Sequence, residues 1–289
     1  MPENTAAREY ILPVSPARFV VLHYHIFKNS GSTVEYALQR TFGNRFATLH
    51  GPDANAILSS GDVAPFLLNH PKIVAISSHH LKYPKPVAPG IIVFDLCMLR
   101  EPLDRLWSMY QHFRRADPVD DLSRKAQEMD ARSFFDFLLE NHPHLVNDVQ
   151  VNVLANGAAY TRPPDSVDLA AALKVAREMS AIGVVDLFDE SLVAAEYFLC
   201  PAFPGIRLEY VKQNVSPPRG PEERFREAVG DCIYQQLSKM NQLDAELVSW
   251  ATGEVRRRFD LAPNALERLA AFRERCEELR AATEPAPDA

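Results

Sequence analysis

The chain has 289 residues, of which 47% are hydrophobic, so it is long enough to form one large α/β domain or two small ones. Its formal net charge of −7 argues against a general nucleic-acid binder, whose affinity rests on many Lys and Arg contacts to phosphate. The sequence has no apolar run near the ~20 residues of a membrane helix and no signal-peptide pattern, so we expect a cytoplasmic protein without a membrane span.

The first part of the chain alternates between predicted strands and helices. Proline residues crowd the loop before the third strand, and Pro102 suits the first turn of the helix after it. In chain order we predict a strand over 18–27, a helix over 33–42, a variable region over 43–71, strands over 73–77 and 91–99, and a helix over 102–115. This alternation predicts a central parallel sheet with right-handed crossovers, flanked by helices.

The second part is predicted to be mainly helical, and residues 116–180 form a helical insertion. After it we predict a strand over 181–185, a helix over 190–199, a strand over 207–211, a loop over 213–220, and helices over 222–240, 244–259 and 265–281. No linker divides the chain, so we expect a single domain over 1–289, with a core over about 18–262 and a C-terminal helix and acidic tail over 263–289. The last helix carries an apolar stripe that packs either on this core or on a second copy in a homodimer; its residues are Leu266, Leu269, Phe272, Cys276 and Leu279.

Residues 26–33 read Ile-Phe-Lys-Asn-Ser-Gly-Ser-Thr and connect the first strand to the first helix. Such a loop leaves backbone N–H groups unpaired at a helix N-terminus, where the macrodipole is positive, so it suits an anion such as phosphate. Lys28 adds a cation, and Ser32 and Thr33 add hydroxyl donors. The Walker A spacing is absent, since no glycine precedes the loop and Lys28 stands at its start, which disfavours an ordinary P-loop NTPase.

Arg100 follows the predicted strand 91–99 directly, and Ser108 lies eight residues further on, along a helix. Ligands of open α/β sheets bind at the carboxyl edge of the strands. An arginine fork and a hydroxyl group at this edge can hold a second phosphate of the same nucleotide.

With these two segments the chain resembles the sulfotransferases that use 3′-phosphoadenosine-5′-phosphosulfate (PAPS), above all the branch of carbohydrate 2-O-sulfotransferases and bacterial homologues. Residues 27–33 are similar to the family's 5′-phosphosulfate loop, usually Pro-Lys-Thr-Gly-Gly-Thr-Ser. Residues 99–102, with Arg105 and Ser108, are similar to its 3′-phosphate motif, Leu-Arg-Asp-Pro followed by Arg and Ser. Ser30 stands where the family often has Gly, and its Cβ would obstruct the loop if that position needs a positive φ.

The resemblance implies a P-loop-like three-layer sandwich and a sulfuryl transfer from PAPS, the donor co-substrate, to a hydroxyl acceptor such as a carbohydrate. It implies a 3′-phosphate clamp made by Arg100 and Ser108. No metal ion is expected, because no acidic or His/Cys cluster in the sequence calls for one. Lys28 would stabilise charge on the leaving phosphate oxygen. The remaining residues of the loop would form the 5′-phosphate cradle: Asn29, Ser30, Gly31, Ser32 and Thr33.

Two adjacent histidines, His79 and His80, follow the strand predicted over 73–77 and are candidates for the general base. The resemblance favours His80, because related enzymes carry a catalytic His with an aromatic residue three positions later, here Tyr83. Alternatively, both histidines only cap the strand end. We expect His23 and His25 to be core imidazoles.

Further polar residues and two other functions are also candidates. His112 is expected at the surface or at a helix end, and Asn147 and Gln150 either face a ligand or are exposed helix polars. Lys212, Asn214 and Ser216 are candidates for a loop over the nucleotide. The alternative functions are a P-loop-type nucleotide or small-molecule kinase and a non-catalytic nucleotide-binding module on the same fold.

Overall fold

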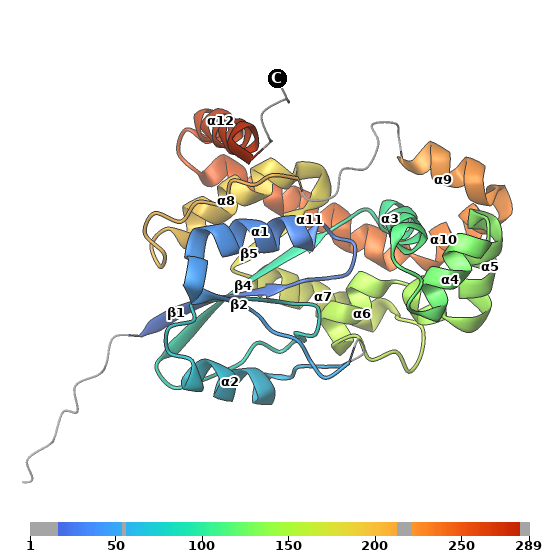
Figure 1. The fold of residues 1–289 in the computed structure, drawn as a ribbon, viewed down its shortest axis with the longest axis horizontal. Coiled ribbons are helices and arrows are strands. Elements are labelled where there is room, and N and C mark those ends of the chain that lie inside the picture. Colours follow the sequence, from blue (N-terminus) through green and yellow to red (C-terminus); the bar gives the residue numbers. More distant parts are fainter. Residues whose placement is uncertain (1–16, 54–55, 213–220, 284–289) are drawn as a thin grey trace, which may run out of the picture.

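The structure is a computed structural model that describes residues 17–53, 56–212 and 221–283 (Figure 1). Its centre is a parallel five-stranded sheet in the order β2-β3-β1-β4-β5. The strands are β1 (Arg18–Tyr24), β2 (Phe46–Thr48), β3 (Ala75–Ser78), β4 (Ile91–Leu99) and β5 (Ala181–Val184). The predicted α/β class with a central parallel sheet is therefore confirmed.

Helices cover both faces of this sheet (Figure 1). Side chains of one sheet face share a buried cluster with α1 (Gly31–Phe42), α8 (Phe188–Leu199) and α12 (Ala265–Thr283). Side chains of the other face share a cluster with α2 (Ser60–Asn69), α6 (Val149–Asn156), α7 (Ser166–Glu178) and α11 (Gln242–Leu261). A strand buried on both faces reads as a continuous apolar run, which is why residues 19–22 predicted β1 well.

The remaining helices form a lobe beside the sheet, on the right in Figure 1. A third apolar cluster, centred on Tyr110, Phe134, Phe135 and Phe225, holds them together. The helices are α3 (Pro102–Arg115), α4 (Asp121–Glu128), α5 (Ala131–Asn141), α9 (Pro221–Val229) and α10 (Asp231–Met240). Three short 3₁₀ turns complete the described elements, at Gly43–Arg45, Pro143–Leu145 and Val185–Leu187.

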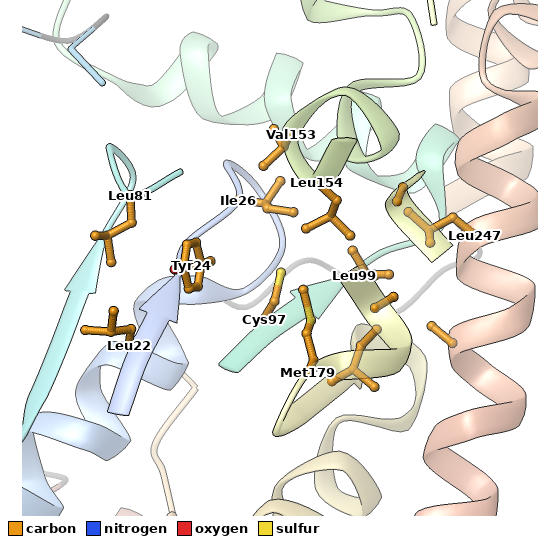
Figure 2. Close-up of a cluster of buried hydrophobic side chains, with 14 of the residues drawn as sticks. Leu22, Tyr24, Ile26, Leu81, Cys97, Leu99, Val153, Leu154, Met179 and Leu247 are labelled. Carbon is orange, nitrogen blue, oxygen red and sulfur yellow. The ribbon is translucent and has the colours of Figure 1, made fainter. Parts of the chain in front are cut away.

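Figure 2 shows the cluster that joins the sheet to α6 and α11. Tyr24 and Cys97 are partners in the β1–β4 register, and both are buried. Leu154 of α6 and Leu247 of α11 belong to the same cluster and are also buried. Because this packing reaches the ends of β1 and β4, α6 lies directly behind the loops that follow these two strands.

The strand order has a switch point between β1 and β4. The chain leaves β1 through α1 and returns to the sheet at β2, on the β3 side of β1. It leaves β4 through α3 and the helical lobe and returns at β5, on the opposite side. Connections that diverge in this way open a crevice at the carboxyl ends of the two strands, where ligands of such folds bind.

Several predicted boundaries are wrong for local reasons. The strand predicted over 18–27 ends at Tyr24, because the N–H of Ile26 donates to the carbonyl of Tyr24 and turns the chain. The segment 207–211 is no strand: the N–H of Leu208 bonds the Glu196 carboxylate, and that of Tyr210 bonds the Cys276 sulfur. The helix predicted over 222–240 is two helices, α9 and α10, which meet at Gly230 with φ 78°.

Three further points concern strand β2, the predicted loop 213–220 and membrane spans. The strand β2 was not predicted, because three residues carry too little pattern. Asn214, Ser216 and the rest of the predicted loop 213–220 lie outside the described residues. In the part of the chain that is described, no helix is both long and apolar enough to cross a bilayer.

The stripe of the C-terminal helix α12 divides between core and surface. Leu269 and Phe272 are buried with α1 and α8, whereas Leu266 is 76% exposed. We therefore expect Phe272→Ala to lower the free energy of unfolding by about 3–5 kcal/mol in urea denaturation, through lost burial and a cavity. Leu266→Ala on the same helix is the control, with an expected change within about 0.5 kcal/mol. Equal small effects would contradict the packing of α12 on α8.

Candidate functional site

A cavity of about 840 Å³ opens at the carboxyl ends of β1 and β4. It is within the range of ordinary small-molecule sites. Both predicted anion-binding segments line it, so residues about 70 positions apart in the sequence face one space. The predicted site residues on its wall are Lys28, Ser30, Gly31, Ser32, Thr33, His79, Arg100 and Ser108. Asn29 and His80 are not on this wall.

The loop after β1 brings the N-terminus of α1 to the cavity. Ser30 is the N-cap residue, and its side chain makes no capping hydrogen bond. The first N–H groups of a helix have no partner inside the helix, so this end of α1 presents donors and a positive dipole to the cavity. Lys28 and Ser30 have φ values of 67° and 58°, so two residues with a Cβ occupy the left-handed region in which glycine is favoured.

Gly31 allows the ring of His25 to lie against the start of α1. A Cβ built on Gly31 would lie 1.8 Å from Cδ2 and 2.1 Å from Nε2 of His25. His25 is only 7% exposed but it lines the cavity. His25, expected to be a core imidazole, is therefore also part of the cavity wall. No local pattern indicates this position, because the contact depends on the sharp turn after β1.

The side chain of Asn29 points into the protein instead of the cavity. Its Nδ2 donates to the carbonyl of Met98 and to Oε1 of Gln150, each at 2.8 Å. Asn29 is 1% exposed. The side chain therefore fastens the loop to β4 and α6, and a part for Asn29 in the phosphate cradle stays a prediction.

Arg100 projects from the end of β4 toward the loop after β1. Its Nη1 donates to the carbonyl of Lys28 at 3.2 Å. Its Nε is buried without a partner among the described residues. Burial lowers the pKa of Arg100, and the nearby carboxylates of Asp104 and Asp186 oppose that shift. A guanidinium on the cavity wall, held in place by the carbonyl of Lys28, is well suited to bind an anion there.

The cavity wall around Lys28 is positively charged. Burial lowers the pKa of Lys28, and the neighbouring charges of Arg100 and Arg115 lower it further. Its Nζ lies 5.6 Å from the centre of the Phe27 ring. Cations that lower one another's pKa raise the affinity of the site for an anion, which relieves their repulsion.

Helix α3 contributes one polar face to the cavity, made of Ser108, Gln111, His112 and Arg115. These residues are spaced so that they share a side of the helix. His112 lies in the last turn of α3, as expected of a helix-end residue, and it borders the cavity, where burial and the charge of Lys28 lower its pKa. The predicted start of helix α3 is confirmed: Pro102 is its first residue, and the Glu101 carboxylate caps the helix by accepting the N–H of Asp104.

The two candidate histidines differ in position and in their available nitrogen atoms. His79 lines the cavity, and its Nδ1 lies 3.0 Å from the carbonyl of His25. A carbonyl only accepts, so Nδ1 carries the proton and Nε2 keeps its lone pair in the neutral ring. In His80, Nδ1 accepts the N–H of Gly51 at 2.6 Å, so its neutral ring has its proton on Nε2.

The surroundings of His79 keep its ring neutral. Its pKa falls to about 4, first through burial and then through the neighbouring ring of His25, whose centre is 3.6 Å away. The residue still exposes more than a third of its surface, since it borders an open cavity. His79 is therefore an uncharged hydrogen-bond acceptor at neutral pH.

Glu35 of α1 lies behind the histidines. Its Oε2 accepts the hydroxyl of Ser77 at 2.9 Å and lies 3.8 Å from Nδ1 of His25. The interaction with His25 is the main cause that lowers the pKa of Glu35. His23 is the core imidazole that the sequence predicts: it is buried, and its Nδ1 is 2.9 Å from the hydroxyl of Ser77.

The far end of the cavity is lined by residues that sequence reasoning did not select as site residues. Asp186 lies in the 3₁₀ turn Val185–Leu187, Asp189 and Glu190 lie in the first turn of α8, and Arg273 comes from α12. Asp189 accepts hydrogen bonds from the hydroxyl of Tyr210 at 2.7 Å and from Nε of Arg273 at 2.8 Å. These contacts join segments 21 and 84 residues apart in the sequence, so no local pattern could reveal them.

Lys212 also lines this cavity, whereas the neighbouring loop residues are not described. Gln150, a candidate ligand residue in the sequence, is fully buried and faces neither the cavity nor solvent. Within the described ranges, no three His, Cys, Asp or Glu side chains are grouped closely enough to hold a metal ion.

Comparison with known proteins adds one relative. No family model matches the chain. An uncharacterized protein of Archaeoglobus fulgidus is 26% identical over 247 residues, which are 81% of this chain and 95% of that protein. The match extends over nearly the whole length of the archaeal protein, so the two chains are similar throughout and not in a single motif.

Substitutions at the adjacent residues Ser30 and Gly31 should have opposite effects on the free energy of unfolding. Ser30→Gly removes a Cβ from a left-handed residue and should raise the free energy of unfolding by up to about 1 kcal/mol. Gly31→Ala inserts a Cβ into the ring of His25 and should lower it by about 1–3 kcal/mol. Urea denaturation of the two variants measures both. Destabilisation by Ser30→Gly would show that the described loop conformation is wrong.

Proposed function

We propose that the protein is a sulfotransferase that moves a sulfuryl group from PAPS to a hydroxyl acceptor. The observation that carries the proposal is that the α1 N-terminus with Lys28 and the Arg100–Ser108 pair face one cavity of about 840 Å³. The hydrogen bond from Arg100 to the carbonyl of Lys28 shows how close the two segments are. Two anion sites on the wall of one cavity suit a nucleotide with anionic groups at both its 5′ and 3′ positions better than a singly phosphorylated one.

In this proposal, the backbone N–H groups at Gly31 and Ser32 hold the 5′-phosphosulfate. Arg100 and Ser108 hold the 3′-phosphate. Lys28, in a partly buried position, stabilises the charge that collects on the phosphate oxygen as its bond to sulfur breaks. The sulfuryl group carries less charge than a phosphoryl group, and these residues supply positive charge without a metal ion.

We assign the general base to His79 and not to His80. In-line transfer forms a bond between the acceptor oxygen and sulfur while the acceptor hydroxyl gives up its proton. Nε2 of His79 has the lone pair that takes this proton, and its Nδ1–H is held by the carbonyl of His25. The single accepting nitrogen of His80 is already used by Gly51.

The acceptor would then approach from the side of Phe27, His79 and His112. These residues form the aromatic end of the cavity, with Phe27 and His112 rings 5.4 Å apart. Flat rings beside hydrogen-bonding groups suit a hydroxylated ring such as a sugar or a phenol. We include carbohydrates among the candidate acceptors on this basis.

Arg100→Ala should weaken the binding of 3′-phosphoadenosine-5′-phosphate about 10- to 100-fold, because a charge-assisted contact is lost. Isothermal titration calorimetry measures the effect. Arg114→Ala is the control: it removes an arginine from the last turn of α3, where the guanidinium lies over the Tyr110 ring and away from the cavity, and should leave the affinity unchanged. Tighter binding of Mg-ATP than of the bisphosphate would favour the kinase alternative and contradict the proposal.

His79→Ala should abolish labelled-sulfate transfer from PAPS to a pool of sugars and phenols, while nucleotide affinity stays within about threefold. His80→Ala should keep most of the activity. The reverse result would overturn the assignment of the base, and wild-type protein that binds the nucleotide but sulfates no acceptor would favour a non-catalytic module.

The pH profile of kcat/KM gives a second readout. The pKa of His79 is lowered to about 4, so the ring stays neutral as the pH falls below the ordinary value of ~6.5. Activity should therefore persist through pH 6 and decline only near pH 4–5. A decline centred near pH 6.5 would contradict His79 as the base in these surroundings.

A further inference from the structure

One buried amide connects the two anion-binding segments. Oε1 of Gln150 accepts Nδ2 of Asn29 at 2.8 Å and the backbone N–H of Arg100 at 2.9 Å. Its Nε2 donates to the carbonyl of Arg100 at 2.8 Å. Gln150 thus holds the peptide groups on both sides of Arg100 and, through Asn29, the loop that carries Lys28.

The amide itself has a single orientation. Its Nε2 also lies 3.3 Å from Oδ2 of Asp244, whose carboxylate accepts the backbone N–H groups of Gln150 at 3.0 Å and Val151 at 2.7 Å. Both acceptor positions and both hydrogens of the Gln150 amide are therefore used. A flipped amide would place donors against the N–H groups of Asn29 and Arg100.

We propose that Gln150 is a positioning residue that sets the separation of the 5′- and 3′-anion sites. It touches no ligand, since it is fully buried behind the cavity. This inference rests on the proposed function, because a separation matters only to a ligand that occupies both sites at once.

The physical reason is the coupling of two binding events through one ligand. Once the first anionic group is bound, the second binds at a high effective concentration, provided that the distance between the sites matches the ligand. If the sites shift relative to each other by about 1 Å, much of that gain is lost. Each site alone would keep its own donors and its own affinity for a single phosphate.

Three ligands separate positioning from a general structural role. Isothermal titration calorimetry on the full chain would compare 3′-phosphoadenosine-5′-phosphate with adenosine 5′-monophosphate and adenosine 3′-monophosphate. In Gln150→Met, which keeps the volume, the bisphosphate should bind at least about tenfold more weakly, and each monophosphate within about threefold of wild type. Gln150→Ala should behave in the same way and serves as the second variant if Gln150→Met does not fold.

Asn152→Ala provides the control. Asn152 is a buried amide on the same helix, 4% exposed, and its Oδ1 accepts from Asn156, away from both loops. Its variant should keep the wild-type ratio of bisphosphate to monophosphate affinity.

The outcomes are distinguishable. Parallel losses for all three ligands, or an unchanged bisphosphate affinity in the Gln150 variants, would overturn the positioning role alone. Wild-type protein that binds the bisphosphate no more tightly than the monophosphates would overturn the proposed function itself.

Discussion

The site depends most on the hydrogen bonds that the carboxylate of Asp244 accepts from helix α6. This carboxylate comes from α11, is fully buried, and accepts two backbone N–H groups from the first turn of α6. The N-cap residue of α6, Asp148, makes no side-chain cap of its own to that turn, so Asp244 caps α6 from another helix. Asp148 in return accepts the N–H of Asp244 at 2.8 Å.

Burial raises the pKa of Asp244, whereas the hydrogen bonds from α6 and the cation of Arg105 lower it. Arg105 is itself completely buried, and its guanidinium donates to the carbonyl of Leu145 at 3.0 Å. A buried charge is tolerated where donors and an opposite charge compensate its lost hydration. The set of groups around Asp244 therefore fixes α6, and α6 fixes the amide of Gln150 between the two loops.

A negative net charge of −7 coexists with a local excess of positive charge at the cavity. Lys28, Arg100 and Arg115 meet there, and acidic residues are held at the far end by Arg273 and Tyr210. Such a distribution concentrates attraction for anions in one place on a protein that otherwise repels polyanions. His25 and His79 add polar rings to the cavity wall. Burial lowers the pKa of His79, and also that of the core imidazole His23, below its ordinary value.

Sequence patterns alone predicted the elements nearest to the cavity. The strand 91–99 and the helix 102–115 have the predicted bounds, because a buried apolar run and a proline at the first helical position are local signals. The loop after β1 was also recognised as a helix N-terminus with small polar residues. The position of Lys28 and Arg100 at the same sheet edge followed from the rule that parallel strands share their carboxyl ends.

Only the tertiary structure decided which side chains face the cavity. His79 and His80 are adjacent, and successive residues at a strand end point to different sides, so a shift of one residue exchanges them. The carbonyl of His25 and the N–H of Gly51 settle their orientations. Asn29 and Gln150 likewise read as exposed or ligand-binding polars until the fold brought them together from 121 residues apart. The periodicity of a sequence encodes the backbone and its apolar faces, whereas the direction of a polar side chain depends on partners that distant segments supply.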